Sequence, residues 1–285
     1  MPRMIVDVHT HIFPPRLIEE RERLAASDRA FGEMYAEPRA RMATAEDLLA
    51  SMDGAGVDIS IAAGFWWRAA ATAEEHANYL LDVAAASGGR IVPFVPVTAA
   101  TDDAALSALV EGGARGLGEV RPGTETPGAA VDDALDAMLT RATGELGLPL
   151  LVHSSEEVGH QYLGKSGGYT PGALWQLIEA CSDPRSRVIA GHWGGGLPFY
   201  ALMPEVRAVL ESGRLVFDTA ASPLLYDPSV FAHSLALVGS EHVLWGSDYP
   251  LRDQAHDRAA VEVAIDGDAD RAAVLGANAE RFLSL

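Results

Sequence analysis

Apolar, β-branched runs alternate with Ala- and Leu-rich amphipathic stretches along the whole chain. Eight runs have the length and composition of β-strands, at 3–11, 58–64, 90–97, 114–120, 149–155, 187–195, 214–222 and 242–250. Helical periodicity occurs between them, at 44–55, 73–86, 102–111, 131–146, 171–181, 200–211 and 228–237, and twice more at 258–264 and 270–282. The sequence therefore predicts a strand followed by a helix, repeated along the chain.

This alternation favours a parallel sheet of βαβ units, and eight repeats within 285 residues suit a closed (β/α)8 TIM barrel. An open doubly wound sheet would usually carry a glycine-rich nucleotide loop after its first strand, where this sequence has THIFPP. No linker rich in Gly, Ser or Pro divides the chain. We expect an α/β fold with a single barrel domain over residues 1–285 and an insertion at 12–43.

Composition excludes several classes of function. The 40 acidic and 21 basic residues give a formal net charge of −19, which disfavours binding to nucleic acid. No apolar run approaches the roughly 20 residues of a membrane span, and the N-terminus lacks a signal-peptide pattern, so we expect a cytoplasmic protein without a membrane partner. Cys181 is the single cysteine, so a metal here must be held by His, Asp or Glu.

Polar residues occur where the predicted strands end. In a parallel barrel these ends meet at one face, where the loops build the active site. Four of the nine histidines are among the residues placed there, which are His9, His11, Glu119, His153, His192 and Asp248.

The stretch DVHTH at 7–11 carries the most specific pattern. Alternation along a strand predicts that Asp7, His9 and His11 point the same way. Two imidazoles at i and i+2 can each offer a ring nitrogen to one metal ion, and a third imidazole with a carboxylate completes a site open to water. We expect one divalent ion, Zn or alternatively Mn, with a second ion undecided. Asp7 lies deeper and is predicted to support a neighbouring polar group rather than bind the ion.

The ordered motifs DVHTHIFP, VHSS, AGHWGG, LWGSDYP and LGANAERFL resemble the amidohydrolase superfamily, and within it the amidohydrolase-2 branch. That branch includes aromatic acid decarboxylases and a pyrone-dicarboxylate lactonase. The resemblance implies that the metal ligands are His9, His11, His153 and Asp248. It also implies that Asp248 exchanges protons and that His192 acts in catalysis. Relatives commonly form dimers or larger assemblies, so a homo-oligomer is a candidate arrangement.

Glu119 has several alternative roles. The GEV sequence resembles a carboxylate that bridges two metals in some relatives, so Glu119 could bind a second ion, act as a general base or accept a hydrogen bond from a ligand. An ion pair with nearby Arg121 is an equally reasonable structural explanation.

Further residues near the strand ends are candidates for substrate binding. His160 lies on a glycine-rich loop with Tyr162 and Lys165, and could reach the mouth of the barrel. Arg121 and Arg252 could bind a substrate carboxylate, since a guanidinium matches its geometry. Trp66 and Trp193 could form the wall of a pocket for a planar small molecule.

Two reactions fit these residues. The first is hydrolysis of an ester, lactone or amide of a small organic acid, which we favour because an extra carboxylate, Glu119, suits water activation. The alternative is non-oxidative decarboxylation of an aromatic or unsaturated carboxylic acid. A barrel that binds metal or ligand without catalysis is a third hypothesis, although His192 and Asp248 supply the proton-handling groups that it would lack.

Overall fold

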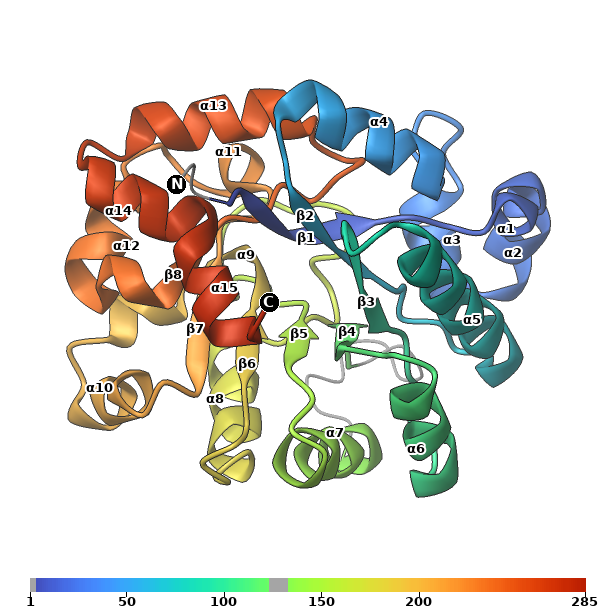
Figure 1. Cartoon of the computed structure of the whole chain (residues 1–285). Coiled ribbons are helices and arrows are strands. Elements are labelled where there is room, and N and C mark those ends of the chain that lie inside the picture. The colour runs from blue at the N-terminus through green and yellow to red at the C-terminus, as the bar shows by residue number, and fades with distance from the viewer. Residues whose placement is uncertain (1–3, 123–132) are drawn as a thin grey trace.

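Residues 4–122 and 133–285 are described in the computed structural model, and they form the predicted (β/α)8 barrel (Figure 1). Parallel strands follow one another around the sheet in sequence order. They are β1 (Val6–His11), β2 (Ile59–Ala63), β3 (Ile91–Val95), β4 (Gly116–Val120), β5 (Leu150–Val152), β6 (Val188–Ala190), β7 (Leu215–Asp218) and β8 (Val243–Leu244). The ring closes because β1 bonds to the segment after β8, through Val8 N to Trp245 O at 2.9 Å and Asp248 N to His9 O at 2.9 Å.

Helices cover the outside of the strands (Figure 1). They are α4 (Ala45–Ala55), α5 (Ala70–Ala86), α6 (Asp103–Glu111), α7 (Asp133–Glu145), α8 (Pro171–Ala180), α10 (Pro204–Glu211), α12 (Val230–Val238), α13 (Gln254–Ala264), α14 (Asp268–Ala272) and α15 (Asn278–Leu283), with short helices α9 (Gly191–Gly194) and α11 (Ser222–Leu225) at the rim. The helix expected at 131–146 starts in residues that lie outside the described ones. In the described part of the chain, no helix has the length and apolar character that a bilayer span requires.

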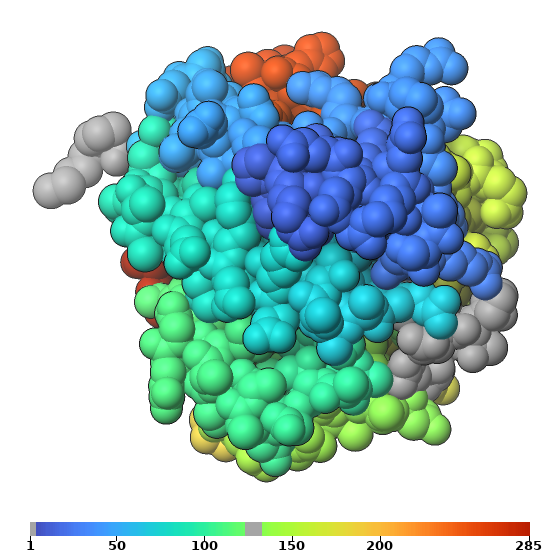
Figure 2. Space-filling view, turned by 90° about the vertical axis from the view of Figure 1, so that its right-hand side faces the viewer, coloured from blue at the N-terminus to red at the C-terminus, as the bar shows by residue number. Residues whose placement is uncertain are grey.

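The insertion after β1 forms three short helices, α1 (Pro15–Glu19), α2 (Arg21–Ser27) and α3 (Arg29–Tyr35). Asp28 begins α3 as its N-cap, accepting a hydrogen bond from Phe31 N at 3.0 Å. Phe31 packs in an aromatic cluster with the segment that follows β2. In Figure 2 the insertion lies on the surface against α5, where Arg16 donates to Glu75 at 2.7 Å. The insertion therefore packs against the end of the barrel at which β1 and β2 finish.

Apolar side chains fill both faces of the sheet. Side chains that alternate along the strands, among them Leu151, Ile189 and Val216, form the interior cluster together with Ala279 and Leu283 of α15. That helix lies across the N-terminal end of the barrel (Figure 1). The other set of strand side chains packs against the outer helices. The C-terminal end thus remains for polar groups.

A bulge in β1 changes the direction of its side chains. Asp7 pairs with Ser60 of β2, but the next pair is Thr10 with Ala62, so β1 uses one residue more than β2. Val8 packs in the interior cluster, whereas Asp7 accepts a hydrogen bond from Gln254 of α13 at 2.8 Å, on the outer side. The prediction that Asp7 and the two imidazoles share one face is therefore wrong, because strict alternation does not allow for a bulge.

Buried His76 of α5 ties two strand ends together. Its Nε2 donates to Ile12 O at 2.7 Å, and its Nδ1 accepts from Trp67 Nε1 at 3.0 Å. Burial lowers the pKa of His76 to about 4, from an ordinary value of 6.5. The ring is thus neutral in the folded protein and holds the segments after β1 and β2 in place.

The pH dependence of stability tests this role of His76. Between pH 6.5 and 4 the unfolded chain binds a proton that the folded chain rejects, so the free energy of unfolding falls by about 3 kcal/mol as pH falls. Urea unfolding of chelator-treated wild type and His76→Gln at pH 7.5 and 4.5 should show a smaller loss in the variant. Equal losses in both proteins would contradict the assignment.

Candidate metal centre

Six buried side chains meet at the C-terminal end of the barrel. They come from two strands and from the segments that follow three others, and they are His9 and His11 of β1, Glu119 of β4, His153 after β5, His192 in α9 after β6 and Asp248 after β8. This convergence follows from the parallel topology, because consecutive strands all end at the same face. The structure thus brings together the residues that the sequence places at strand ends.

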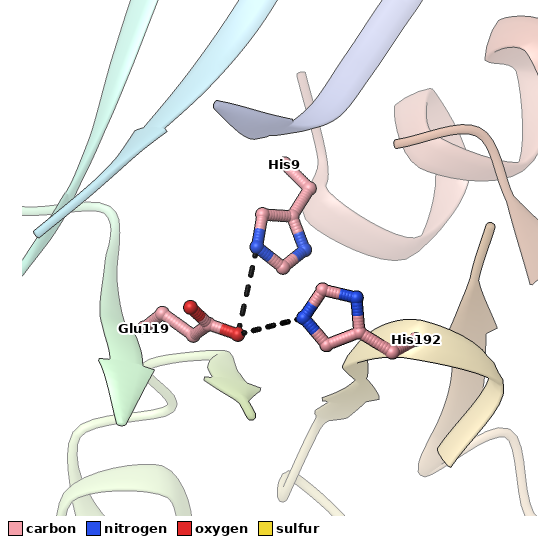
Figure 3. A group of neighbouring side chains, drawn as sticks. All are labelled: His9, Glu119 and His192. Atoms are coloured by element: carbon pink, nitrogen blue, oxygen red, sulfur yellow. Dashed lines mark ion pairs between the residues drawn. The ribbon is translucent and has the colours of Figure 1, made fainter. Parts of the chain in front are cut away.

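Glu119 lies at the centre of the cluster. Its Oε1 is 2.9 Å from His153 Nδ1, 3.4 Å from His192 Nε2 and 3.5 Å from His9 Nε2, and Figure 3 shows the last two contacts. Its Oε2 is 3.5 Å from His11 Nε2. The alternative ion pair with Arg121 is not formed, since that guanidinium faces Glu33 instead.

Asp248 closes the other side of the cluster. Its Oδ1 lies 3.5 Å from His11 Nε2 and 3.9 Å from His9 Nε2, and these two imidazole nitrogens are 3.2 Å apart. Donor atoms about 2.1 Å from one ion are separated by roughly 3.0–3.4 Å in tetrahedral or octahedral geometry. The spacing of these groups is therefore close to that of ligands around a single ion.

Each of the four imidazoles has one ring nitrogen that points away from the centre of the cluster, called here the outer nitrogen, and this nitrogen lies next to a fixed acceptor. His9 Nδ1 faces Asp218 Oδ2 at 2.8 Å, His11 Nδ1 faces Ala63 O at 3.2 Å, and His192 Nδ1 faces Ala220 O at 3.2 Å. His153 is turned the other way, with Nε2 facing Gly164 O at 3.1 Å. A carbonyl or carboxylate oxygen only accepts, so each outer nitrogen carries the proton and each neutral ring presents a lone pair to the centre.

A cation fits this donor set better than any other occupant. Converging lone pairs and carboxylates offer acceptors without donors, and burial makes that arrangement costly unless positive charge balances it. Among the described residues, two groups of side chains each have potential ligand atoms that all lie within 4.8 Å of one another. One group is His9, Glu119 and His192, and the other is His9, His11 and Asp248. Nitrogen and oxygen donors without thiolate suit Zn or Mn. The shared His9 nitrogen has one lone pair, so we interpret the two groups as one centre.

The protonation of the cluster reflects the same excess of acceptors. Burial disfavours a charged His9, but the carboxylates of Asp218 and Glu119 outweigh burial and raise its pKa well above the usual value. Burial likewise opposes ionised Glu119, yet His153 and His9 hold its pKa well below the ordinary range. Burial by itself lowers the pKa of His192, but the carboxylates of Glu119 and Asp248 outweigh burial and raise this pKa to about 9, with Glu119 the main favourable partner. Protons thus balance charge where a divalent ion would otherwise do so.

Irregular backbone aims three of these side chains. In β4, Leu117 pairs with Leu150 and Val120 with Val152, so a second bulge brings Glu119 inward. Gly118 precedes it with φ 151°, and a Cβ there would lie 2.8 Å from Leu151, so only glycine fits.

The other two irregular positions are His192 and Asp248, which have left-handed φ angles of 56° and 65°. Such angles cost about 1–2 kcal/mol per non-glycine residue and are concentrated at functional sites. The N–H of His192 offsets part of this cost by donating to Asp218 Oδ1 at 2.8 Å.

Two carboxylates support the cluster without joining it. Asp218, at the end of β7, holds both the His9 ring and the His192 backbone, and sequence reasoning missed it although the RLVFDTAAS strand places it at the same rim. Asp7 accepts from Ser247 Oγ at 2.6 Å and Ser247 N at 3.0 Å, next to Asp248. Burial raises the pKa of Asp7 to about 6 despite these hydrogen bonds.

Of the candidate substrate-binding residues, Trp66 and Arg121 lie beside the centre. The Trp66 ring is 4.8 Å from the His153 ring, and Arg121 Cζ is 5.2 Å from the Trp66 ring. Both side chains are buried. They remain candidates for contact with substrate.

The other candidates are engaged elsewhere. Trp193 is fully buried in the core, with Nε1 donating to Ser222 Oγ at 2.7 Å, because the left-handed turn directs it away from the rim. Arg252 donates to Asp257 at 3.3 Å, which occupies its guanidinium. His160 is exposed, its ring 5.5 Å from Tyr162. Packing or pairing thus accounts for Trp193 and Arg252, and a role of His160 in binding substrate stays a prediction.

Substitution of Asp218 tests the control of imidazole orientation. Asp218→Asn leaves one acceptor oxygen, which can accept either from the backbone N–H groups or from His9 Nδ1. The amide NH2 then faces the donor that is left over, or it donates to His9 Nδ1 and so reverses the tautomer of that ring. We expect the dissociation constant for Zn, measured by competition with a chromophoric chelator, to rise about 10–100-fold. The N-cap variant Asp102→Asn, which alters a surface carboxylate, should leave it unchanged. Unchanged affinity in Asp218→Asn would refute the role.

Solved structures of similar shape share the entire barrel. A 5-carboxyvanillate decarboxylase from Sphingomonas paucimobilis has a TM-score of 0.76 at 18% identity, covering 99% of each chain. A 2,6-dihydroxybenzoate decarboxylase from Rhizobium has a TM-score of 0.72 at 16% identity, also covering 99% of each. A 5-carboxyvanillate decarboxylase from Novosphingobium aromaticivorans, complexed with manganese and 4-hydroxy-3-methoxy-5-nitrobenzoic acid, has a TM-score of 0.76 at 17% identity, covering 100% of this chain and 97% of that one.

No curated protein matches the sequence. The model of the amidohydrolase family, in contrast, matches residues 6–285. That range starts at β1 and includes every strand end that contributes to the cluster. The chain therefore belongs to the amidohydrolase family, as an enzyme of hydrolase or decarboxylase type.

Proposed function

We propose that the enzyme is a metal-dependent decarboxylase of an aromatic or unsaturated carboxylic acid. The observation that carries the proposal is the position of Trp66, whose flat indole packs against the candidate ligand His153 with the Arg121 guanidinium beside it. A planar apolar surface and a cation next to the centre suit a planar acid. Proteins of the same fold named as decarboxylases of aromatic acids add support.

Glu119 no longer favours hydrolysis. Hydrolysis would need a carboxylate that is free to activate water. The oxygens of Glu119 instead lie within 3.5 Å of four imidazole nitrogens. A carboxylate in that position balances the charge of the rings and orients them. We therefore propose decarboxylation in preference to hydrolysis.

The candidate ligands are His9, His11, His153 and Asp248, with Glu119 beside them. A divalent ion held there supplies Lewis acidity towards an oxygen of the substrate. The ion would take the place of the protons that balance the buried carboxylates, so metal binding should release protons.

Side chains of this protein supply the proton that the reaction needs. Decarboxylation requires one proton at the ring carbon that bears the carboxylate. The bond from that carbon to the carboxylate then breaks, its electron pair stays with the ring, and CO2 leaves. We assign the role of proton donor to Asp248. His192 is near enough to Asp248 for that carboxylate to raise the pKa of the imidazole, so we assign His192 as the group that exchanges protons with Asp248. Burial of the cluster excludes bulk water from the carbon that accepts the proton.

Isotope incorporation tests the reaction type. Protein loaded with Zn or Mn should release one CO2 per molecule from a hydroxybenzoate or hydroxyisophthalate panel and, in D2O, place one deuterium at the vacated carbon, as observed by NMR. Asp248→Asn should lower kcat by about 100-fold or more, since it removes the proton donor. Asp253→Asn, a surface N-cap change, is the matched control. Turnover of lactones or esters without CO2 release would overturn the proposal.

A further inference from the structure

Two buried N–H groups beside the metal centre have no hydrogen-bond partner. They are Arg121 Nε and Trp66 Nε1, and neither has an acceptor among residues 4–122 and 133–285. The two side chains are 4% and 5% exposed and lie in one stack, with Arg121 Cζ 5.2 Å from the indole ring. An unsatisfied buried donor costs about 1–3 kcal/mol and is rare in folded proteins. Two of them on side chains that stack on each other point to an acceptor supplied by a ligand.

The charge of Arg121 is only partly compensated. Its terminal nitrogens lie 3.4–3.5 Å from Glu33 Oε2, longer than the roughly 2.7–2.9 Å of a charge-assisted hydrogen bond. Its other hydrogen bond within the described residues is to the carbonyl of Ser166, which carries no charge. The guanidinium therefore keeps binding capacity for an anionic group.

The neighbouring Lys165 and Arg252 have less capacity to bind an anionic group. Lys165 Nζ donates to Val158 O at 2.6 Å and His160 O at 2.8 Å, so it organises its own loop. Arg252 is paired with Asp257. Within the described part of the chain, this leaves Arg121 as the cation next to His153 with an open N–H.

We propose that Arg121 Nε and Trp66 Nε1 form a subsite for a second carboxylate of the substrate. This proposal rests on the proposed function, and it narrows the substrate to aromatic dicarboxylic acids, in which one carboxylate reacts at the centre and the other binds here. A carboxylate has two acceptor oxygens, one for each donor. A chain of net charge −19 repels a dianion at long range, so a local cation is needed to hold the second charge.

Binding of unreactive analogues tests the subsite independently of turnover. The pair is 2-nitrophenol and 4-hydroxy-3-nitrobenzoate, which differ only by the carboxylate. Isothermal titration of the Zn-loaded protein should give at least about tenfold tighter binding of the carboxylate compound, as expected for charge-assisted hydrogen bonds. In Arg121→Gln this ratio should fall to about two or less.

The variant Trp66→Phe tests the contribution of the Trp66 N–H separately from that of its aromatic surface. The phenyl ring keeps the apolar surface, so the affinity for 2-nitrophenol should stay similar while the carboxylate advantage falls about threefold or more. Arg121→Lys keeps a cation but lacks the Nε donor, and should retain part of the advantage. Arg252→Gln is the matched control and should keep the full ratio.

Two results would overturn the subsite. One is the absence of a carboxylate-dependent gain in wild type, including the case in which neither compound binds. The other is a gain that survives in both Arg121→Gln and Trp66→Phe. Neither result depends on CO2 release, so a failed decarboxylation assay with a normal binding ratio would reject the reaction and leave the subsite standing.

Discussion

The arrangement at the rim depends on one constraint, the protonation of the outward nitrogen of each clustered imidazole. Asp218 fixes this nitrogen in His9, backbone carbonyls fix it in His11 and His192, and the carbonyl of Gly164 fixes it in His153. In their neutral form, four rings held in this way present lone pairs to a space that already contains buried carboxylates. These acceptors need positive charge, which either protons on the rings or a bound cation supplies, and the chemistry of the donor set suits a cation.

The barrel delivers these groups through local departures from its own regularity. Bulges in β1 and β4 turn His9 and Glu119 inward, and left-handed backbone at His192 and Asp248 lets side chains beyond the strand ends point back to the centre. The conformational cost is offset by specific contacts, such as Asp218 accepting from the backbone of His192. Strain and support therefore occur together at the residues that we assign to chemistry.

The barrel and most of the cluster could be predicted from the sequence, because strand and helix periodicity is strong and parallel strands bring distant ends together. The orientation of Asp7 could not be predicted, since a bulge leaves no clear mark on hydrophobic alternation. The packing of Trp193 and the pairing of Arg252 could not be predicted, because a left-handed turn and an ion pair with Asp257 are tertiary features. Asp218 was within reach of the sequence, as it ends the seventh strand with an acid at the rim.

The central claim is that several imidazoles of this cluster bind one divalent ion, and X-ray absorption spectroscopy of the Zn-loaded protein tests it directly. We predict a first shell of nitrogen and oxygen only, at about 2.0–2.2 Å, with the multiple scattering of at least three imidazoles. The triple variant His9→Ala, His11→Ala, His153→Ala should lose that scattering. A spectrum of fully hydrated zinc, or an imidazole signal unchanged in the variant, would contradict the account.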